Sequence, residues 1–161
     1  MRRALCIFAF GLILFAASTA ASAQSSNPII QGGVQGIELC PQFICGFALF
    51  TGGFQGQIGG NPNAAGIITA AMTHTELPQA GDPPATITGG KWELRTLTRR
   101  IRGNVVGGSI TFLPNDLFEI RILLDLQAPT GGGLVGFVGI LSHQTLIPTF
   151  GGNLVQLPPQ P

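Results

Sequence analysis

The stretch LFEIRILLDL, residues 117–126, alternates apolar and charged side chains and decides the fold class of this protein. Its apolar residues occupy every second position from Phe118 onward, and the positions between them include Glu119, Arg121 and Asp125. Successive side chains of a β-strand point to opposite faces, so a period of two indicates a strand with one buried and one solvated face. The stretch therefore predicts a strand of an antiparallel sheet.

The same alternation recurs along the chain in short runs that glycine and proline separate. Paired glycines and the segments NPN and LPND mark turns, because glycine tolerates positive φ and proline presets the turn. No segment shows the apolar stripe of a helix. We expect an all-β protein of about eight strands, over residues 47–58, 66–74, 85–96, 99–106, 109–113, 117–127, 134–143 and 150–157.

Strands joined by short turns predict a single antiparallel domain, and eight of them can close into an up-and-down β-barrel with no free edge. The run FALFTGGFQGQI, residues 47–58, supports a barrel. Along one of its faces Phe50, Phe54 and Ile58 alternate with small residues, as expected where a strand coils around a narrow interior. A two-sheet β-sandwich is the alternative architecture.

The first 23 residues have the three parts of a secretory signal peptide. Arg2 and Arg3 precede an apolar run from residue 7 to residue 17, and Ala21-Ser22-Ala23 supplies the cleavage pattern. We expect cleavage after Ala23 and a secreted or periplasmic protein. The apolar run is shorter than the roughly 20 residues of a membrane-spanning helix, and no later run approaches that length, so no membrane span is predicted in the mature chain.

The mature chain is expected to form an N-terminal arm over residues 24–45, the barrel over 46–157 and a flexible tail over 158–161. Without Arg2 and Arg3, six of the eight Lys and Arg residues remain against seven Asp and Glu residues. The resulting net charge of −1 provides no general attraction to nucleic acid, which is therefore not a predicted partner. Gly131, Gly133 and Gly136 match the dinucleotide-binding pattern G-x-G-x-x-G, but a strand and not a helix is expected after them, so the match is interpreted as a hairpin turn and no cofactor is predicted.

Cys40 and Cys45, in the segment CPQFIC, are predicted to form a disulfide, because export favours oxidation. A metal site would need two further ligands, and a redox-active pair would need the Cys-x-x-Cys spacing. No metal site is predicted. We expect the disulfide to link the N-terminal arm covalently to the first strand.

The two histidines lie in similar settings, AAMTHTELP at residues 70–78 and GILSHQTLIP at 139–148. An internal duplication of residues 66–94 and 136–157 is one hypothesis, and shared turn chemistry is the other. His74 and His143 both have inward parity at a strand end, where a hydroxyl or a backbone carbonyl commonly satisfies imidazole. At a barrel mouth, either could instead bind a ligand or transfer a proton, so both are the candidate ligand-binding and catalytic residues.

The segment KWELRTLTRRIR, residues 91–102, concentrates five of the six basic residues of the mature chain. Such a run is usually a solvated outer face that discourages edge-to-edge aggregation. The functional alternative is an anion-binding stripe for an acidic polysaccharide, a lipid headgroup or a partner protein. Its candidate contacts are Arg95, Arg99, Arg100 and Arg102.

These features favour an exported, non-enzymatic module that binds an apolar small molecule or the surface of an extracytoplasmic protein or polysaccharide. The alternative is a barrel enzyme of the cyclase or isomerase type that uses His74 or His143. A purely structural envelope or extracellular component is the third possibility. The fold alone does not choose among them, because barrels host many unrelated functions.

Overall fold

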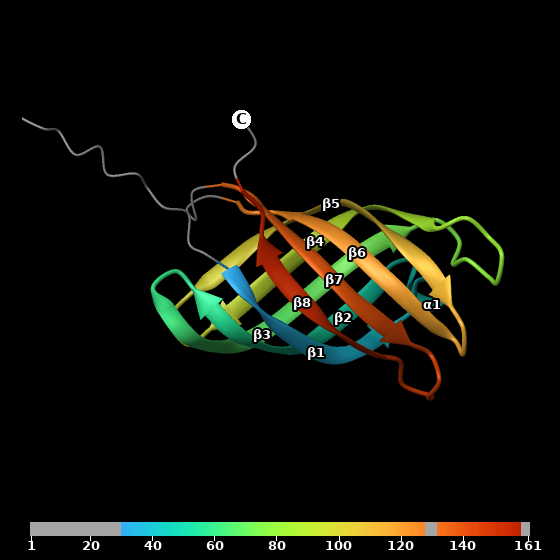
Figure 1. Cartoon of the computed structure of the whole chain (residues 1–161), viewed down its shortest axis with the longest axis horizontal. Helices are drawn as coiled ribbons and strands as arrows, with labels where there is room; N and C mark the ends of the chain where they lie inside the picture. The colour runs from blue at the N-terminus through green and yellow to red at the C-terminus, as the bar shows by residue number, and fades with distance from the viewer. Residues whose placement is uncertain (1–29, 128–131, 159–161) are drawn as a thin grey trace, which may run out of the picture.

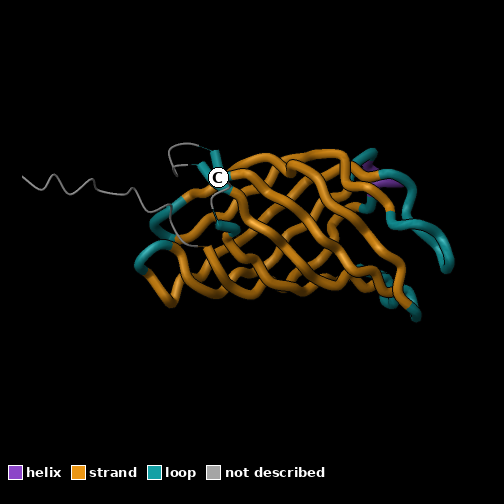
Figure 2. The backbone as a smooth tube through the Cα atoms, turned by 45° about the horizontal axis from the view of Figure 1, so that its top comes forward, coloured by secondary structure: helices purple, strands orange, loops and turns teal. Residues whose placement is uncertain are grey.

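The computed structural model describes residues 30–127 and 132–158, which form a closed eight-stranded antiparallel β-barrel (Figures 1 and 2). Each strand pairs with the next one along the chain, and β8 pairs with β1, so the sheet has no free edge. The predicted fold class is confirmed, and the barrel rather than the sandwich is the architecture. The elements are β1 (Ile30–Cys40), α1 (Gln42–Cys45), β2 (Ala48–Ile58), β3 (Asn61–His74), β4 (Ala85–Thr96), β5 (Arg100–Leu113), β6 (Leu117–Asp125), β7 (Leu134–Ser142) and β8 (Thr149–Gln156).

The predicted signal peptide, residues 1–23, lies outside the described residues. Within the described part of the chain, no helix is long and apolar enough to cross a membrane.

The barrel interior is one apolar core to which every strand contributes. Phe54, Leu94 and Leu154 are among its fully buried side chains. The rings of Phe50 and Phe150 pack edge to face with centroids 5.5 Å apart. Trp92 is also buried, and its indole N–H donates a hydrogen bond to the backbone carbonyl of Asp125, 2.9 Å away. The polar N–H of the buried indole therefore has a hydrogen-bond partner within an otherwise apolar core.

Facing glycines allow the strands to approach closely on one side of the barrel. Gly36 of β1 faces Gly52 of β2 in the ladder. A Cβ atom at Gly36 would lie 2.7 Å from a ring carbon of Phe150, so the phenylalanine ring occupies the space that the glycine leaves. Within residues 47–58, a Cβ atom at Gly52 or Gly56 would meet the backbone of β1, and the ring of Phe54 lies over Gly32. The small residues of this run thus permit close approach of β1 and β2.

Residues 30–40 form β1, although they were expected in an arm outside the barrel. This strand pairs with β2 from Ile30 opposite Ile58 onward and with β8 from Gln31 opposite Val155 onward. Its inward positions alternate Ile30, Val34 and Glu38 with two glycines, which dilutes the apolar alternation in the sequence. The barrel therefore begins at β1 and not at residue 46.

The two strands expected over residues 99–106 and 109–113 are a single strand, β5. Gly107-Gly108 is not a turn but follows a β-bulge, where the pairing with β6 shifts register between Val105 and Gly107. At this irregularity the Asp125 carboxylate accepts hydrogen bonds from the backbone N–H and the side-chain amide of Asn104, the latter at 2.9 Å. A side-chain carboxylate thus replaces a missing ladder partner.

Candidate functional site: the acidic mouth

The end of the barrel at which β1, β3, β5 and β7 terminate collects most of the irregular structure. Four segments surround it: α1, the β3–β4 loop (75–84), the β5–β6 turn (114–116) and the β7–β8 loop (143–148). They lie at the right of Figure 1. None of the four contains Lys or Arg, and the acidic residues at this end are Glu38, Glu76, Asp82 and Asp116. We call this end the acidic mouth.

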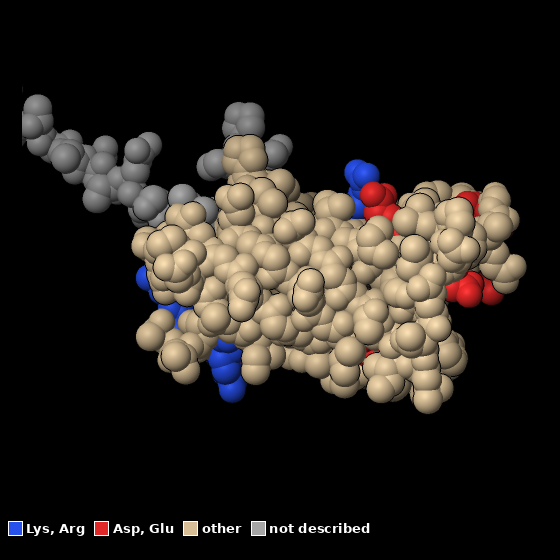
Figure 3. Space-filling model, turned by 60° about the horizontal axis from the view of Figure 1, so that its bottom comes forward, with Lys and Arg blue, Asp and Glu red and all other residues tan. Residues whose placement is uncertain are grey.

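Most basic residues lie towards the opposite end: Figure 3 shows blue at the left and red towards the right, with one further blue group beside a red one at the upper right of centre. We call that opposite end the basic end; it carries the β4–β5 turn (97–99). Successive turns alternate between the two ends of an up-and-down barrel, so each end can carry its own charge.

A pocket of about 400 Å³ opens at the acidic mouth between α1 and the β3–β4 loop. Two carboxylates, one imidazole, one carboxamide and several apolar groups share its walls. The volume lies within the range of about 300–1,000 Å³ typical of small-molecule sites. The lining residues are Glu38, Pro41, Gln42, Phe43, Gly46, His74, Glu76 and Leu77.

Glu38 is the one charged residue that the described part of the chain buries. Its side chain is 4% exposed, and its Oε2 atom lies 3.1 Å from Nε2 of His143, which is 23% exposed. The imidazole also packs against the Phe118 ring, with centroids 5.1 Å apart. Burying a carboxylate is costly unless hydrogen bonds compensate it, and the N–H of His143 supplies one.

The closure of the barrel brings Glu38 and His143 together across 105 residues of sequence. The backbone N–H of Glu38 donates to the carbonyl of Pro148 at 2.9 Å, which ties β1 to the β7–β8 loop. The backbone N–H of His143 donates to the carbonyl of Asp116 at 3.0 Å, which ties the same loop to the β5–β6 turn. These contacts fix the imidazole beside the carboxylate.

His74 ends β3 and lines the pocket directly. Its Nδ1 atom lies 2.6 Å from the carbonyl oxygen of Thr75, the kind of partner expected from the sequence. The Gln42 side chain makes two hydrogen bonds to the backbone of His74. Its amide nitrogen donates to the carbonyl of His74 at 2.7 Å, and its amide oxygen accepts from the N–H of His74 at 2.8 Å. Gln42 thereby holds α1 against the end of β3.

Cys40 and Cys45 lie at disulfide distance, with Cα atoms 6.1 Å apart, as predicted. Their position differs from the expectation that the bridge joins an arm to the first strand. Cys40 is the last residue of β1 and Cys45 the last of α1, so the bridge closes the chain around α1. It therefore shapes the pocket wall that carries Phe43.

The two histidines thus lie at the same end of the barrel but have different relations to the pocket. His74 borders it, whereas His143 reaches it through Glu38. Glu38 itself was not predicted, because a carboxylate at an inward position counts against burial in a sequence pattern. The signal that could have located it is the spacing Ile30, Val34, Glu38 with intervening glycines, which matches the large-and-small pattern of residues 50–58.

Their shared end does not require a duplicated unit. Residues 66–94 and 136–157 fall in the hairpins β3–β4 and β7–β8, whose loops are both at the acidic mouth. Every odd strand of this barrel ends there, so topology alone explains the common position. The duplication remains a prediction.

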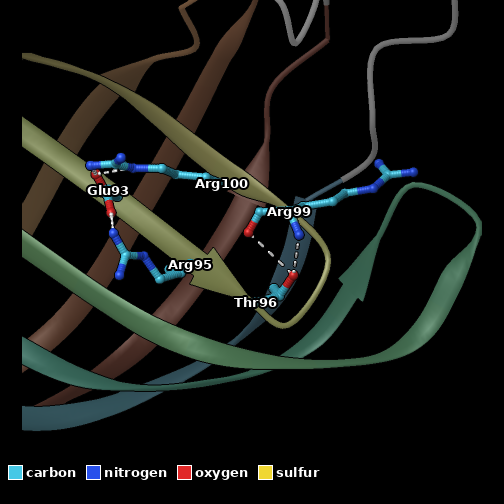
Figure 4. A network of polar contacts seen from close by, with 5 residues as sticks. All are labelled: Glu93, Arg95, Thr96, Arg99 and Arg100. Atoms are coloured by element: carbon cyan, nitrogen blue, oxygen red, sulfur yellow. Dashed lines mark hydrogen bonds and ion pairs between the residues drawn. The ribbon is translucent and has the colours of Figure 1, made fainter.

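The four predicted arginines lie at the basic end, on β4, β5 and the turn between them. Figure 4 shows Arg95, Arg99 and Arg100. Glu93 engages two of them, since its carboxylate lies 2.6 Å from Arg100 and 3.4 Å from Arg95. The hydrogen bond from Arg100 lowers the pKa of Glu93 and correspondingly raises that of Arg100. Arg99 lies in the turn, and Arg102 faces Glu93 across the β4–β5 ladder. The structure thus gives part of the proposed anion stripe an internal partner.

Among residues 30–127 and 132–158, no three His, Cys, Asp or Glu side chains are grouped so that they could hold a metal ion. Comparison with protein-family models, with curated proteins and with solved structures found no match.

Proposed function

We propose that this protein is an exported, non-enzymatic binding module whose site is the pocket of the acidic mouth. Its ligand carries a cationic group joined to an apolar one. The observation that carries the proposal is the composition of the pocket wall: Glu38 and Glu76 line it together with Phe43 and Leu77, and no Lys or Arg lines it.

The physical basis is the complementarity of these groups to an organic ammonium or guanidinium. Carboxylates attract the cation and accept its hydrogen bonds, while an aromatic face adds a cation–π contribution. Phe43 is 81% exposed, so it offers apolar surface that a ligand can cover. Export is supported by the predicted signal peptide at residues 1–23.

The barrel interior is too tightly packed to be the binding site, which favours the pocket of the acidic mouth. The interior cavity has a volume of only about 40 Å³ and an almost wholly apolar lining that includes Phe50, Met72 and Trp92. Small-molecule sites typically occupy about 300–1,000 Å³. An apolar ligand inside the barrel would therefore have to displace packed core side chains.

A titration with three matched probes tests the proposal: benzylammonium, neutral benzyl alcohol and anionic benzoate. We expect benzylammonium alone to shift the backbone NMR signals of Phe43, His74 and Glu76. Glu76→Gln should weaken binding about two- to fivefold, the effect of losing one exposed ion pair. Glu119→Gln, on the outer wall, should leave it unchanged. Equal binding of benzoate, or shifts located away from the mouth, would contradict the proposal.

The Glu38–His143 pair favours a second candidate, an acid–base enzyme of the cyclase or isomerase type. An imidazole within hydrogen-bond distance of a carboxylate is an arrangement that can transfer protons near neutral pH. In such an enzyme Glu38 orients His143, and His74 faces the substrate in the pocket. If His74→Ala and His143→Ala both retained full turnover of a substrate found by screening, this candidate would be excluded.

A further inference from the structure

The β4–β5 turn at the basic end presents an apolar side chain beside a cationic one on an ordered backbone. Leu97 is fully exposed. The N–H of Thr96 donates to the carbonyl of Arg99 at 2.8 Å. The N–H of Arg99 donates to the Thr96 hydroxyl at 3.0 Å (Figure 4). The turn is therefore preorganised, which lowers the entropic cost of docking it into another surface.

The two ends of the barrel carry opposite net charges. The basic end and the adjoining half of the wall have five basic and two acidic residues, giving +3 with Glu93 and Asp125 as the acids. The four acidic residues of the mouth give −4 with His neutral, and Glu119 and Arg121 of β6 pair with each other at 3.0 Å. Two copies placed end to end therefore attract, whereas two copies placed mouth to mouth repel.

We propose that the occupant of the acidic mouth is the β4–β5 turn of a second copy of this chain. Leu97 contacts Phe43 and Leu77 in the pocket, and Arg99 binds the carboxylate of Glu76. The inference rests on the proposed function, because it names the partner of the same pocket: the turn carries the apolar and cationic groups that the pocket walls match.

The contact joins different surfaces of the two copies, so each dimer keeps one free mouth and one free turn. Heterologous contacts of this kind extend into open chains unless their rotation closes a ring. The inferred assembly is therefore a linear series of barrels, and its length grows with protein concentration.

Sedimentation velocity over a range of protein concentrations tests the inference. The wild-type protein should form a concentration-dependent series of oligomers that shortens in high NaCl, since salt screens the attraction. Leu97→Asp/Arg99→Glu blocks the turn, and Phe43→Lys/Glu76→Lys blocks the mouth. Each variant should associate at least tenfold more weakly than the wild type. Val106→Asp/Arg121→Glu changes an exposed valine and an exposed arginine of the outer wall and should associate normally.

Mixing the mouth-blocked variant with Leu97→Ser/Arg99→Ala, which blocks the turn without giving it carboxylates that the new lysines of the mouth would attract, gives the decisive result. Each retains one intact end, so the mixture should form a one-to-one dimer and nothing larger, which also shows that both variants are folded. Leu97→Ser/Arg99→Ala provides a milder block of the turn should the charge reversal impair folding.

Three outcomes overturn the inference: a wild-type protein that stays monomeric, a turn-blocked variant that still associates, or a mixture that forms no dimer. If benzylammonium binds the mouth of a monomeric wild-type protein, the inference fails while the proposed function stands. If the barrels associate end to end and benzylammonium does not bind, the inference stands, and the proposal that the pocket binds a small cationic molecule fails.

Discussion

Gly52 and Gly53 are neighbours in β2 that face opposite sides of the barrel wall, and the fold requires glycine at only one of them. A Cβ atom at Gly52 would lie 2.5 Å from the carbonyl oxygen of Gln35 and 3.0 Å from Cα of Gly36. A Cβ atom at Gly53 would have no atom within 4 Å. The sequence shows two identical residues, and only the direction of each one distinguishes their roles.

We therefore expect Gly52→Ala to lower the free energy of unfolding by about 1–3 kcal/mol through overpacking. Gly53→Ala should leave it unchanged or raise it by about 0.4–1 kcal/mol, because alanine restricts the unfolded chain. Urea denaturation of the two variants measures both effects. Equal destabilisation by the two substitutions would show that the assigned facing of β2 is wrong.

Glu93 contributes stability that depends on pH, because the hydrogen bond from Arg100 lowers its pKa in the folded state. A carboxyl group with a lowered folded pKa stabilises the fold above its unfolded pKa, and this stabilisation is lost as the pH falls through the folded pKa. Glu93→Gln should therefore lower the urea midpoint at neutral pH and have no effect in acid below the folded pKa. Added NaCl should reduce the neutral-pH difference. If the wild type and Glu93→Gln still differed in urea midpoint in acid, the contribution of Glu93 would come from packing and not from its charge.

At the scale of elements, the ranges predicted for β2, β4, β6 and β8 lie close to the observed ones, whereas β1 and β5 were predicted wrongly. Glycine content does not separate the two groups, since β2, β4 and β8 also contain glycine pairs. In β4 and β6, pairs of large apolar residues at alternate positions, such as Trp92 and Leu94, identify the strand. In β1, glycines take every other inward position and Glu38 takes the last buried one. In β5, a glycine pair that resembles a turn sits beside a bulge within a continuous strand. One strand was thus missed and another divided.

The candidate site shows the same limit more sharply. Histidine positions and inward parity placed His74 and His143 at strand ends, and the structure puts both at the acidic mouth. The pairing of His143 with Glu38 depends on β8 lying next to β1, a contact between the two ends of the domain. The barrel predicted from the sequence began at residue 46 and closed without β1, so the buried carboxylate of Glu38 could not be predicted.

The position of α1 depends on Gln42, whose amide makes the two hydrogen bonds that an additional strand residue would make to His74. We expect Gln42→Ala to increase amide hydrogen exchange over residues 42–46, with little change in the core strands. It should also weaken benzylammonium binding, since the wall that carries Phe43 loosens. Gln55→Ala, an exposed glutamine of β2, is the matched control. Unchanged exchange in α1 would show that the disulfide alone holds it.

At the scale of the whole molecule, the up-and-down topology sorts the turns into two ends, and the sequence supplies acids to one and bases to the other. The net charge of −1 over residues 30–158, with His neutral, conceals this separation, because the two ends nearly cancel. The closed barrel then keeps the ends a full strand length apart. The acidic mouth and the basic turn are thus properties of the closed fold, and both the pocket and the end-to-end contact depend on it.

The pairing of β1 with β8 is the contact on which the closed barrel and its mouth depend. NMR measurement of cross-strand nuclear Overhauser effects between Gln35 and Gly151, and between Gly33 and Asn153, tests it most directly, since these residues face each other in the ladder. The closed barrel predicts both sets of effects together with slow amide exchange along β1. Their absence, with β1 amides that exchange as fast as those of an unpaired segment, would contradict the closure and remove Glu38 from the site.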